Sequence, residues 1–403
     1  MKPAIVSLNL LFLSTILTVG CVNSSSRESK TEVPSLPTAF SNEPFSLSEI
    51  ATDMIFIPLS SEVAIPPIRR IDYLDSIFYI IPNDLSKLYR FNSDGKFLDV
   101  FDNKGQGPGE YYAINNFHVF KNGDIYIHDG AMKSMKVYDK ELNYTKTIPY
   151  PDNITHGFSY CLGNKFYLIP YVVDISPEYD WAVMNTSGLL IDYKLNPYAE
   201  KTLSFSGQGS LLVMEDDNAL YVYKNYSDTI FRIDENGYAP AYYVNRTFDD
   251  GLRMLSIDEI FLKVESPSQI IDPRNSNGRR KIAYMYKADS ILIIAYSGQK
   301  SETVIFNTYL NTAKVALVDN IGMPYLPDTW AGSGNININR ILSINGEKYI
   351  VSIMDAYKLK EKVQSQDFIN NQPEKPDLKE RMIALSEQVS ENDNPILVLF
   401  RLK

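Results

Sequence analysis

Three residue types that carry much of protein chemistry are scarce in this chain. Its 403 residues include only 2 cysteines, 2 tryptophans and 3 histidines. So few side chains, widely spaced, form neither a disulfide framework nor a cluster of histidine and cysteine metal ligands. We therefore expect no bound metal and no cofactor.

A dense basic surface is missing as well. Asp and Glu number 49 against 39 Lys and Arg, for a net charge of -10. Such a charge repels a polyphosphate, so we expect no nucleic acid partner. The composition is sufficient for a hydrophobic core, because 44% of the residues are hydrophobic and 22% are charged, as in globular proteins.

The only long apolar run is at the start. Lys2 precedes apolar residues 4–19, and Gly20 and Cys21 follow, which is the layout of a signal peptide. The stretch Thr18-Val19-Gly20-Cys21 resembles the lipobox of bacterial lipoproteins. The resemblance implies cleavage before Cys21, a lipid on its sulfur and a membrane partner through that anchor. The alternative is an uncleaved helix, but the run is short for a bilayer span.

These features set the expected domain boundaries. Residues 1–20 are the signal peptide, residues 21–48 hold the lipidated cysteine and a Ser-rich, charged tether, and residues 49–403 form the folded domain. With Cys21 acylated, Cys161 is the one remaining thiol. Its apolar neighbours indicate a buried structural cysteine rather than a nucleophile.

A repeat of about 47 residues organises the rest. Tyr and Phe, which favour strands, number 28 and 19. Strands that end in short polar turns recur at residues 89–98, 137–142, 183–188, 231–237 and, after an insertion, 305–310. Each has a similar strand upstream, and no 3.6-residue period appears. Four strands in such a unit are typical of a β-propeller blade.

The two ends of the chain supply one more unit. Residues 349–354 and 395–402 read as strands, and so do residues 54–59. Pairing the ends in one blade removes the edges that an open ring would expose. We expect an all-β fold, a six-bladed β-propeller with short helical insertions, although five or seven blades remain open.

Several segments resemble a known family. They are Lys104-Gly105-Gln106-Gly107-Pro108-Gly109-Glu110-Tyr111, residues 122–127, residues 137–139, Phe56-Ile57-Pro58-Leu59 and residues 394–399. The first three resemble the NHL repeat, and together they are similar to the six-bladed propeller lipoproteins of Bacteroidetes. The resemblance implies this architecture and export, and it implies no reaction.

The glycine-rich stretch in that resemblance has a local interpretation. Gly105, Gly107, Pro108 and Gly109 predict a tight turn between blades, in a conformation that most side chains could not adopt. No Lys-Ser/Thr and no helix follow, so the stretch is not a phosphate loop.

Two insertions interrupt the β pattern, at about residues 249–283 and 357–394. The first predicts a short helix over residues 254–264. In the second, Asp377 precedes Glu380 by three residues, a capping box that predicts a helix to about Val389. These insertions either cover the sheets beside them or wall a binding site around the propeller axis.

Candidate chemistry is sparse. We expect ordinary core or loop positions for the three histidines, which are His118, His128 and His156. The possible ligand-binding residues are aromatic, because such rings stack on sugars or peptides: Tyr171, Tyr179, Trp181, Tyr325 and Trp330. The alternative is that these rings pack between blades.

We therefore expect a lipid-anchored propeller of the outer membrane that binds a glycan, peptide or partner protein without catalysis. The side of the membrane stays open. One alternative is a hydrolase or lyase with its active site in the axial funnel. Another is a structural subunit of an envelope complex.

Overall fold

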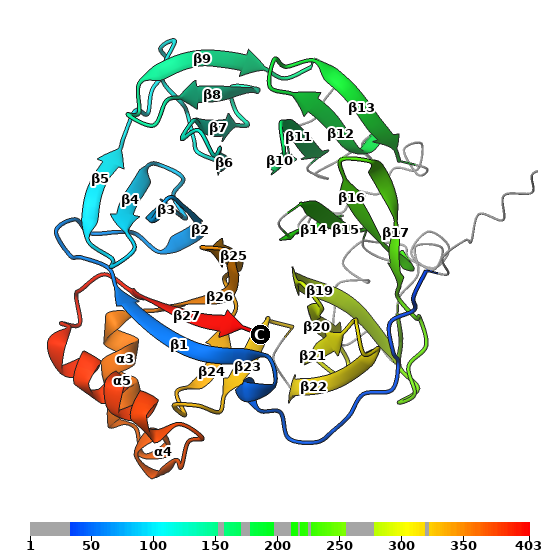
Figure 1. Cartoon of the computed structure of the whole chain (residues 1–403), viewed down its shortest axis with the longest axis vertical. Helices are drawn as coiled ribbons and strands as arrows, with labels where there is room; N and C mark the ends of the chain where they lie inside the picture. Colours follow the sequence, from blue (N-terminus) through cyan, green and yellow to red (C-terminus); the bar gives the residue numbers. More distant parts are fainter. Residues whose placement is uncertain are drawn as a thin grey trace, which may run out of the picture. The chain divides into compact units, whose positions relative to one another are not determined.

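Small antiparallel sheets arranged around an axis form the domain (Figure 1). The computed structural model describes residues 33–151, 157–170, 178–196, 211–216, 218–224, 227–254, 278–318 and 322–403. Val33–Lys403 is one compact unit. The predicted signal peptide and Cys21 lie outside the described residues.

The first four blades are four-stranded meanders in which neighbouring strands follow chain order. The first blade contains β2 (Ile68–Leu74), β3 (Ile77–Pro82), β4 (Leu88–Asn92) and β5 (Phe97–Phe101). The second contains β6 (Asn116–Val119), β7 (Ile125–Asp129), β8 (Ser134–Tyr138) and β9 (Tyr144–Pro149). The third contains β10 (Gly157–Leu162), β11 (Lys165–Pro170), β12 (Tyr179–Asn185) and β13 (Leu190–Leu195). The fourth contains β14 (Leu211–Asp216), β15 (Ala219–Lys224), β16 (Thr229–Asp234) and β17 (Gly237–Tyr243).

The fifth blade adds a short parallel strand to this plan. It contains β18 (Arg253–Met254), β19 (Arg279–Ala288), β20 (Ile291–Gly298), β21 (Glu302–Asn307) and β22 (Thr312–Val318). A two-stranded hairpin, β23 (Tyr325–Asp328) and β24 (Gly334–Asn337), follows it. The helix expected over residues 254–264 lies outside the described residues except for Met254, which is in β18.

The sixth blade closes the ring with both ends of the chain. Its strands are β25 (Arg340–Ile344), β26 (Glu347–Met354), β27 (Ile396–Leu402) and, outermost, β1 (Ala51–Pro58). β1 pairs antiparallel with β27, so that Phe56 lies opposite Val398. The predicted six-bladed ring and its shared last blade are confirmed.

The second insertion is more helical than the sequence indicated. It forms α3 (Ala356–Gln364), α4 (Gln366–Asn370) and α5 (Pro376–Gln388). The helix α5 begins after Lys375, with Asp377 in its first turn rather than at the cap, so the capping-box prediction is wrong. Pro376 starts the helix instead, since its fixed φ suits the first helical position. Leu378 and Met382 of α5 are buried in one cluster with β27, and the helices lie outside the ring against the sixth blade (Figure 1).

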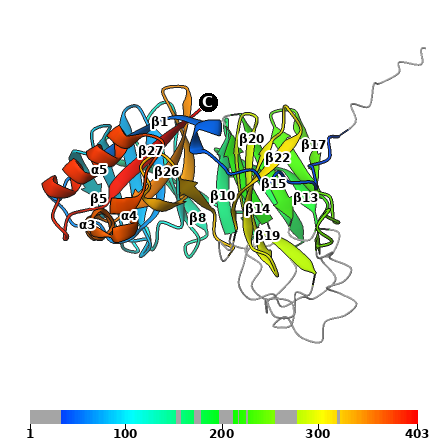
Figure 2. The same ribbon diagram turned by 90° about the horizontal axis from the view of Figure 1, so that it is seen from below.

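The chain joins the propeller earlier than expected. Residues 33–46, here called the N-terminal strap, run along the outer edges of the fourth and fifth blades (Figure 2). Leu36 N–H donates to the carbonyl of Tyr243 at 2.8 Å, and Ser41 N–H to that of Ala313 at 3.0 Å. Leu36 and Phe45 are buried, so the domain begins near Val33 and not at residue 49. Burial of these apolar side chains explains the difference.

The glycine-rich stretch does form the loop between the first and second blades, but for another reason than the one predicted. Gly105, Gly107 and Gly109 are not among the residues with positive φ. Space is what they provide, because a Cβ on Gly105 would lie 1.9 Å from a carboxylate oxygen of Glu110. That carboxylate accepts a hydrogen bond from Gly107 N–H at 2.8 Å.

Candidate functional site

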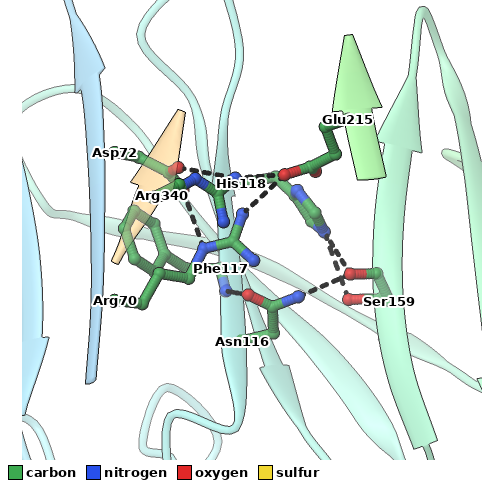
Figure 3. A network of polar contacts seen from close by, with 8 residues as sticks. All are labelled: Arg70, Asp72, Asn116, Phe117, His118, Ser159, Glu215 and Arg340. Atoms are coloured by element: carbon green, nitrogen blue, oxygen red, sulfur yellow. Dashed lines mark hydrogen bonds and ion pairs between the residues drawn. The ribbon is translucent and has the colours of Figure 1, made fainter. Parts of the chain in front are cut away.

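The strands labelled around the axis in Figure 1 are β2, β6, β10, β14, β19 and β25, one from each blade. Charged side chains on three of these strands meet there: Arg70 and Asp72 from β2, Glu215 from β14 and Arg340 from β25. We call these four residues the axial ionic network, and Figure 3 shows them. Arg70 and Asp72 are two residues apart in one strand, which puts both side chains on the same face.

The network connects blades that are far apart around the ring. Arg340 of the sixth blade lies 2.9 Å from Asp72 of the first blade and also pairs with Glu215 of the fourth. Arg70 Nε lies 3.0 Å from Asp72, and its Nη2 lies 3.6 Å from Glu215. Because the first and fourth blades face one another across a six-membered ring, these pairs span the axis.

The four side chains are surrounded by blades yet remain accessible to water. They are 12% exposed for Arg70, 18% for Asp72, 28% for Glu215 and 22% for Arg340. Their charges balance, with two cations and two anions. Such a site offers both hydrogen-bond donors and acceptors without a net charge.

Glu215 is a permanent carboxylate in this setting. Burial opposes its ionisation, but attraction to Arg340 and Arg70 is stronger, and the net effect lowers the pKa of Glu215 to about 2. It therefore carries no proton to donate near neutral pH.

A neutral polar cluster extends the network toward the second and third blades (Figure 3). His118 Nε2 of β6 lies 3.1 Å from the backbone oxygen of Ser159 in β10 and 3.2 Å from its Oγ. The side-chain amide of Asn116 donates to the same backbone oxygen. All three residues are buried.

His118 and Ser159 do not form a nucleophilic pair. Burial, followed by repulsion from Arg70, lowers the pKa of His118 to about 3, so the ring is neutral. Its Nε2 must carry a proton to donate to the backbone oxygen, and then it cannot accept one from the Ser159 hydroxyl. The cluster holds two blades together.

The other histidines fit the expectation of structural roles where they are described. His128 is buried, and its Nδ1 contacts the hydroxyl of Tyr150. Asp129 instead accepts hydrogen bonds from the backbone N–H groups of Tyr112 and Met132. The adjacent side chains therefore have separate partners, and His156 lies outside the described residues.

Cys161 is a poor nucleophile. It is half-buried in β10, and burial raises its pKa to about 12. Among the described residues, no group of three His, Cys, Asp or Glu side chains could hold a metal ion.

The predicted aromatic residues do not come together. Trp181 is buried between the third and fourth blades, where Lys194 Nζ lies 5.4 Å from its ring. Tyr179 is partly buried against Tyr193, with ring centroids 5.2 Å apart. Neither residue lies in the axial ionic network, and Tyr171 lies outside the described residues.

The second aromatic pair lies in the β23–β24 hairpin. Tyr325 is partly buried in β23. Trp330 is fully buried, its indole N–H donates to Ser48 Oγ at 2.7 Å, and Lys375 Nζ lies 3.2 Å from its ring. Packing explains Trp181 and Trp330, because neither ring is open to a ligand.

Sequence reasoning missed the axial ionic network. The charged residues of β2, β14 and β25 are separated in the chain, and only the ring closure brings them together. A usable signal was present in β2, where Arg70 and Asp72 alternate with apolar residues in the first strand of a repeat unit.

Comparison with known proteins identifies the family. A model for a domain of unknown function, DUF4934, matches residues 31–401. The chain belongs to this family. No curated protein matches the chain.

Two solved structures resemble this DUF4934 protein in fold. A proposed exported protein from Bacteroides fragilis is 18% identical, with a TM-score of 0.68, over 92% of this chain and 99% of that one. A member of the DUF4221 family from Bacteroides vulgatus is 8% identical, with a TM-score of 0.50, over 88% and 97%. At these identities the likeness concerns the fold alone. Among the described residues, no helix has the length and apolar character needed to cross a membrane.

Proposed function

We propose that this protein is an exported, lipid-anchored envelope propeller that binds a polar ligand at the axial ionic network without catalysing a reaction. The observation that carries the proposal is the arrangement around Arg340. Its guanidinium pairs with acids from two other blades, yet all four side chains of the network remain partly accessible to water, at 12% to 28% exposure.

The hydrogen-bonding capacity of Arg340 supports binding. A guanidinium has five N–H donors, and within the described part of the chain its ion pairs with Asp72 and Glu215 are both made by Nη2. The balanced charge favours a ligand with both donors and acceptors, such as a glycan or a peptide, over a polyanion.

The protonation states argue against acid–base catalysis at this site. Glu215 stays ionised and His118 stays neutral near pH 7, because their pKa values are about 2 and about 3. A general acid needs a pKa near the working pH. A hydrolase or lyase would require other groups.

Export and anchoring rest on the N-terminal sequence. The lipobox-like Thr18-Val19-Gly20-Cys21 and the resemblance of several segments to the six-bladed propeller lipoproteins of Bacteroidetes support the proposed attachment to the outer membrane, on either side. Metabolic labelling with an alkyne fatty acid tests the anchor. The wild-type chain should take up the label and Cys21→Ser should not, and equal labelling of both contradicts the anchor.

A thermal-shift screen of the chain from Val33 onward tests binding. Neutral oligosaccharides, acidic oligosaccharides and short peptides are added in turn, since a ligand of the native state raises the melting temperature. A reproducible rise identifies the ligand class, and product analysis of the same mixture tests for turnover. If the wild-type protein turns over a compound and Glu215→Gln does not, the site is catalytic, and the proposal of binding without a reaction is wrong.

A further inference from the structure

An apolar rim lies on the outer strands of the third and fourth blades. Six large side chains on or beside β13 and β17 are between 41% and 63% exposed, and we call them the apolar rim: Leu189, Ile191, Tyr193, Leu195, Tyr238 and Tyr243. A run of this kind on a protein surface marks a contact site for a partner or a membrane.

The two strands of the rim are adjacent. Lys194 of β13 has its Nζ 6.0 Å from the ring of Tyr238 in β17, and both views of the structure draw β13 and β17 on the same side of the ring (Figures 1 and 2). The amine of Lys194 pairs with Asp180 at 3.0 Å, and the same carboxylate also pairs with Lys224 at 2.6 Å.

The N-terminal strap fixes where the chain leaves the propeller. Tyr243 N–H donates to the carbonyl of Pro34 at 2.9 Å, and Leu36 N–H donates back to Tyr243 at 2.8 Å. The described chain therefore begins at the edge of β17, beside a residue of the apolar rim. The thirteen residues from Cys21 to Val33 can span at most about 40 Å.

We infer that the apolar rim rests on the surface of the membrane that holds the anchor. The inference depends on the proposed lipid attachment at Cys21, which keeps β17 within reach of the bilayer. Tyrosine and leucine suit the interface, where an amphipathic ring lies at headgroup level. Asp192 is exposed among the rim residues, so zwitterionic lipids fit better than anionic ones.

Site-specific fluorescence tests this contact. The lipidated full-length chain carries Tyr193→Cys, labelled with an environment-sensitive dye, in vesicles of phosphatidylcholine and phosphatidylethanolamine. Tyr309→Cys is the matched control, since Tyr309 is 86% exposed in the turn after β21 of the fifth blade and is not part of the apolar rim. Labelled wild type gives the background from Cys161.

Vesicles should raise dye emission at position 193 about twofold and leave position 309 unchanged. No change at position 193 in protein that floats with the vesicles overturns the inference. A rise that needs no vesicles and grows with protein concentration assigns the rim to a second copy and also overturns it.

Failure of the anchor is a separate outcome. If the lipidated chain does not float, Cys21 attachment fails. The same labelled variants are then held on nickel-chelating vesicles through an N-terminal His tag. A rise at position 193 alone still supports the rim, and equal signals at both positions reject it.

Discussion

The guanidinium of Arg340 on the sixth blade forms an ion pair with the carboxylate of Glu215 on the fourth. Arg340 also pairs with Asp72 on the first blade at 2.9 Å. Arg340→Gln leaves both acids without this cation, and breaking such partly buried pairs should cost about 2 kcal/mol, between the cost for an exposed pair and that for a fully buried one. Urea denaturation of the chain from Val33 onward measures the loss.

Arg401→Gln is the matched control for that variant. Arg401 pairs with Glu347 at 3.4 Å, and the side chains are 39% and 52% exposed. An exposed pair contributes about 0.5 kcal/mol. Equal stability losses in the two variants would contradict a structural role for the axial pairs.

His118 should make stability fall as the pH falls from about 6.5 toward about 3. Its pKa is lowered from 6.5 to about 3 in the folded chain, so in this window the unfolded chain binds a proton that the native chain does not. Stability then declines by up to about 1.4 kcal/mol per pH unit. Denaturation at pH 7 and pH 5 should show about 2 kcal/mol of this loss. In His118→Gln that contribution disappears, and an unchanged pH dependence refutes the assignment.

Glu215 affects stability at a lower pH than His118 does, so it does not disturb the comparison between pH 7 and pH 5. Its folded pKa is lowered from 4.5 to about 2. The stability it contributes is therefore complete above pH 4.5 and is lost as the pH falls toward 2. Glu215→Gln should flatten the stability curve below pH 4.5 and not above it.

The N-terminal strap should stabilise the ring. Leu36 is 4% exposed in the cluster beneath the fourth and fifth blades, so Leu36→Ala should cost about 2 to 3 kcal/mol. Leu98→Ala, at a position 45% exposed in β5, should change stability by no more than about 0.5 kcal/mol. Thermal melts of both variants measure the two losses. If the strap does not stabilise the ring, Leu36→Ala and Leu98→Ala should have the same melting temperature.

Trp330→Ala separates packing from ligand binding. The indole is fully buried, and its removal should cost about 3 to 5 kcal/mol. Any ligand found in the thermal-shift screen should still bind this variant. Loss of binding with unchanged stability would restore Trp330 as a ligand-binding residue.

Local patterns predicted the ring well. The repeated turns at residues 89–98 and 137–142 became the outer hairpins of the first two blades. Pairing of the chain ends followed from the need to cover open edges, and β1 does pair with β27. These features depend on neighbours in the chain or on a general rule for sheets.

The site depended on long-range geometry. Asp72 and Arg340 are far apart in the sequence, and only closure of the ring brings them together. Tryptophan at 181 and 330 looked accessible because Pro and Gly lie nearby, yet neighbouring elements cover both rings. The sequence predicts a tether where the strap lies, because its few apolar residues show no period, and only the partner strands reveal their burial.

The most direct test of the central claim locates the ligand at the axial ionic network. The strongest compound from the screen is titrated into wild type, Arg340→Gln and Arg401→Gln by calorimetry. We predict that Arg340→Gln binds at least about tenfold more weakly, a loss of about 1.4 kcal/mol, while Arg401→Gln binds as wild type does. Equal affinity of all three proteins, or a screen in which no compound shifts the wild-type melting temperature, would contradict the axial site.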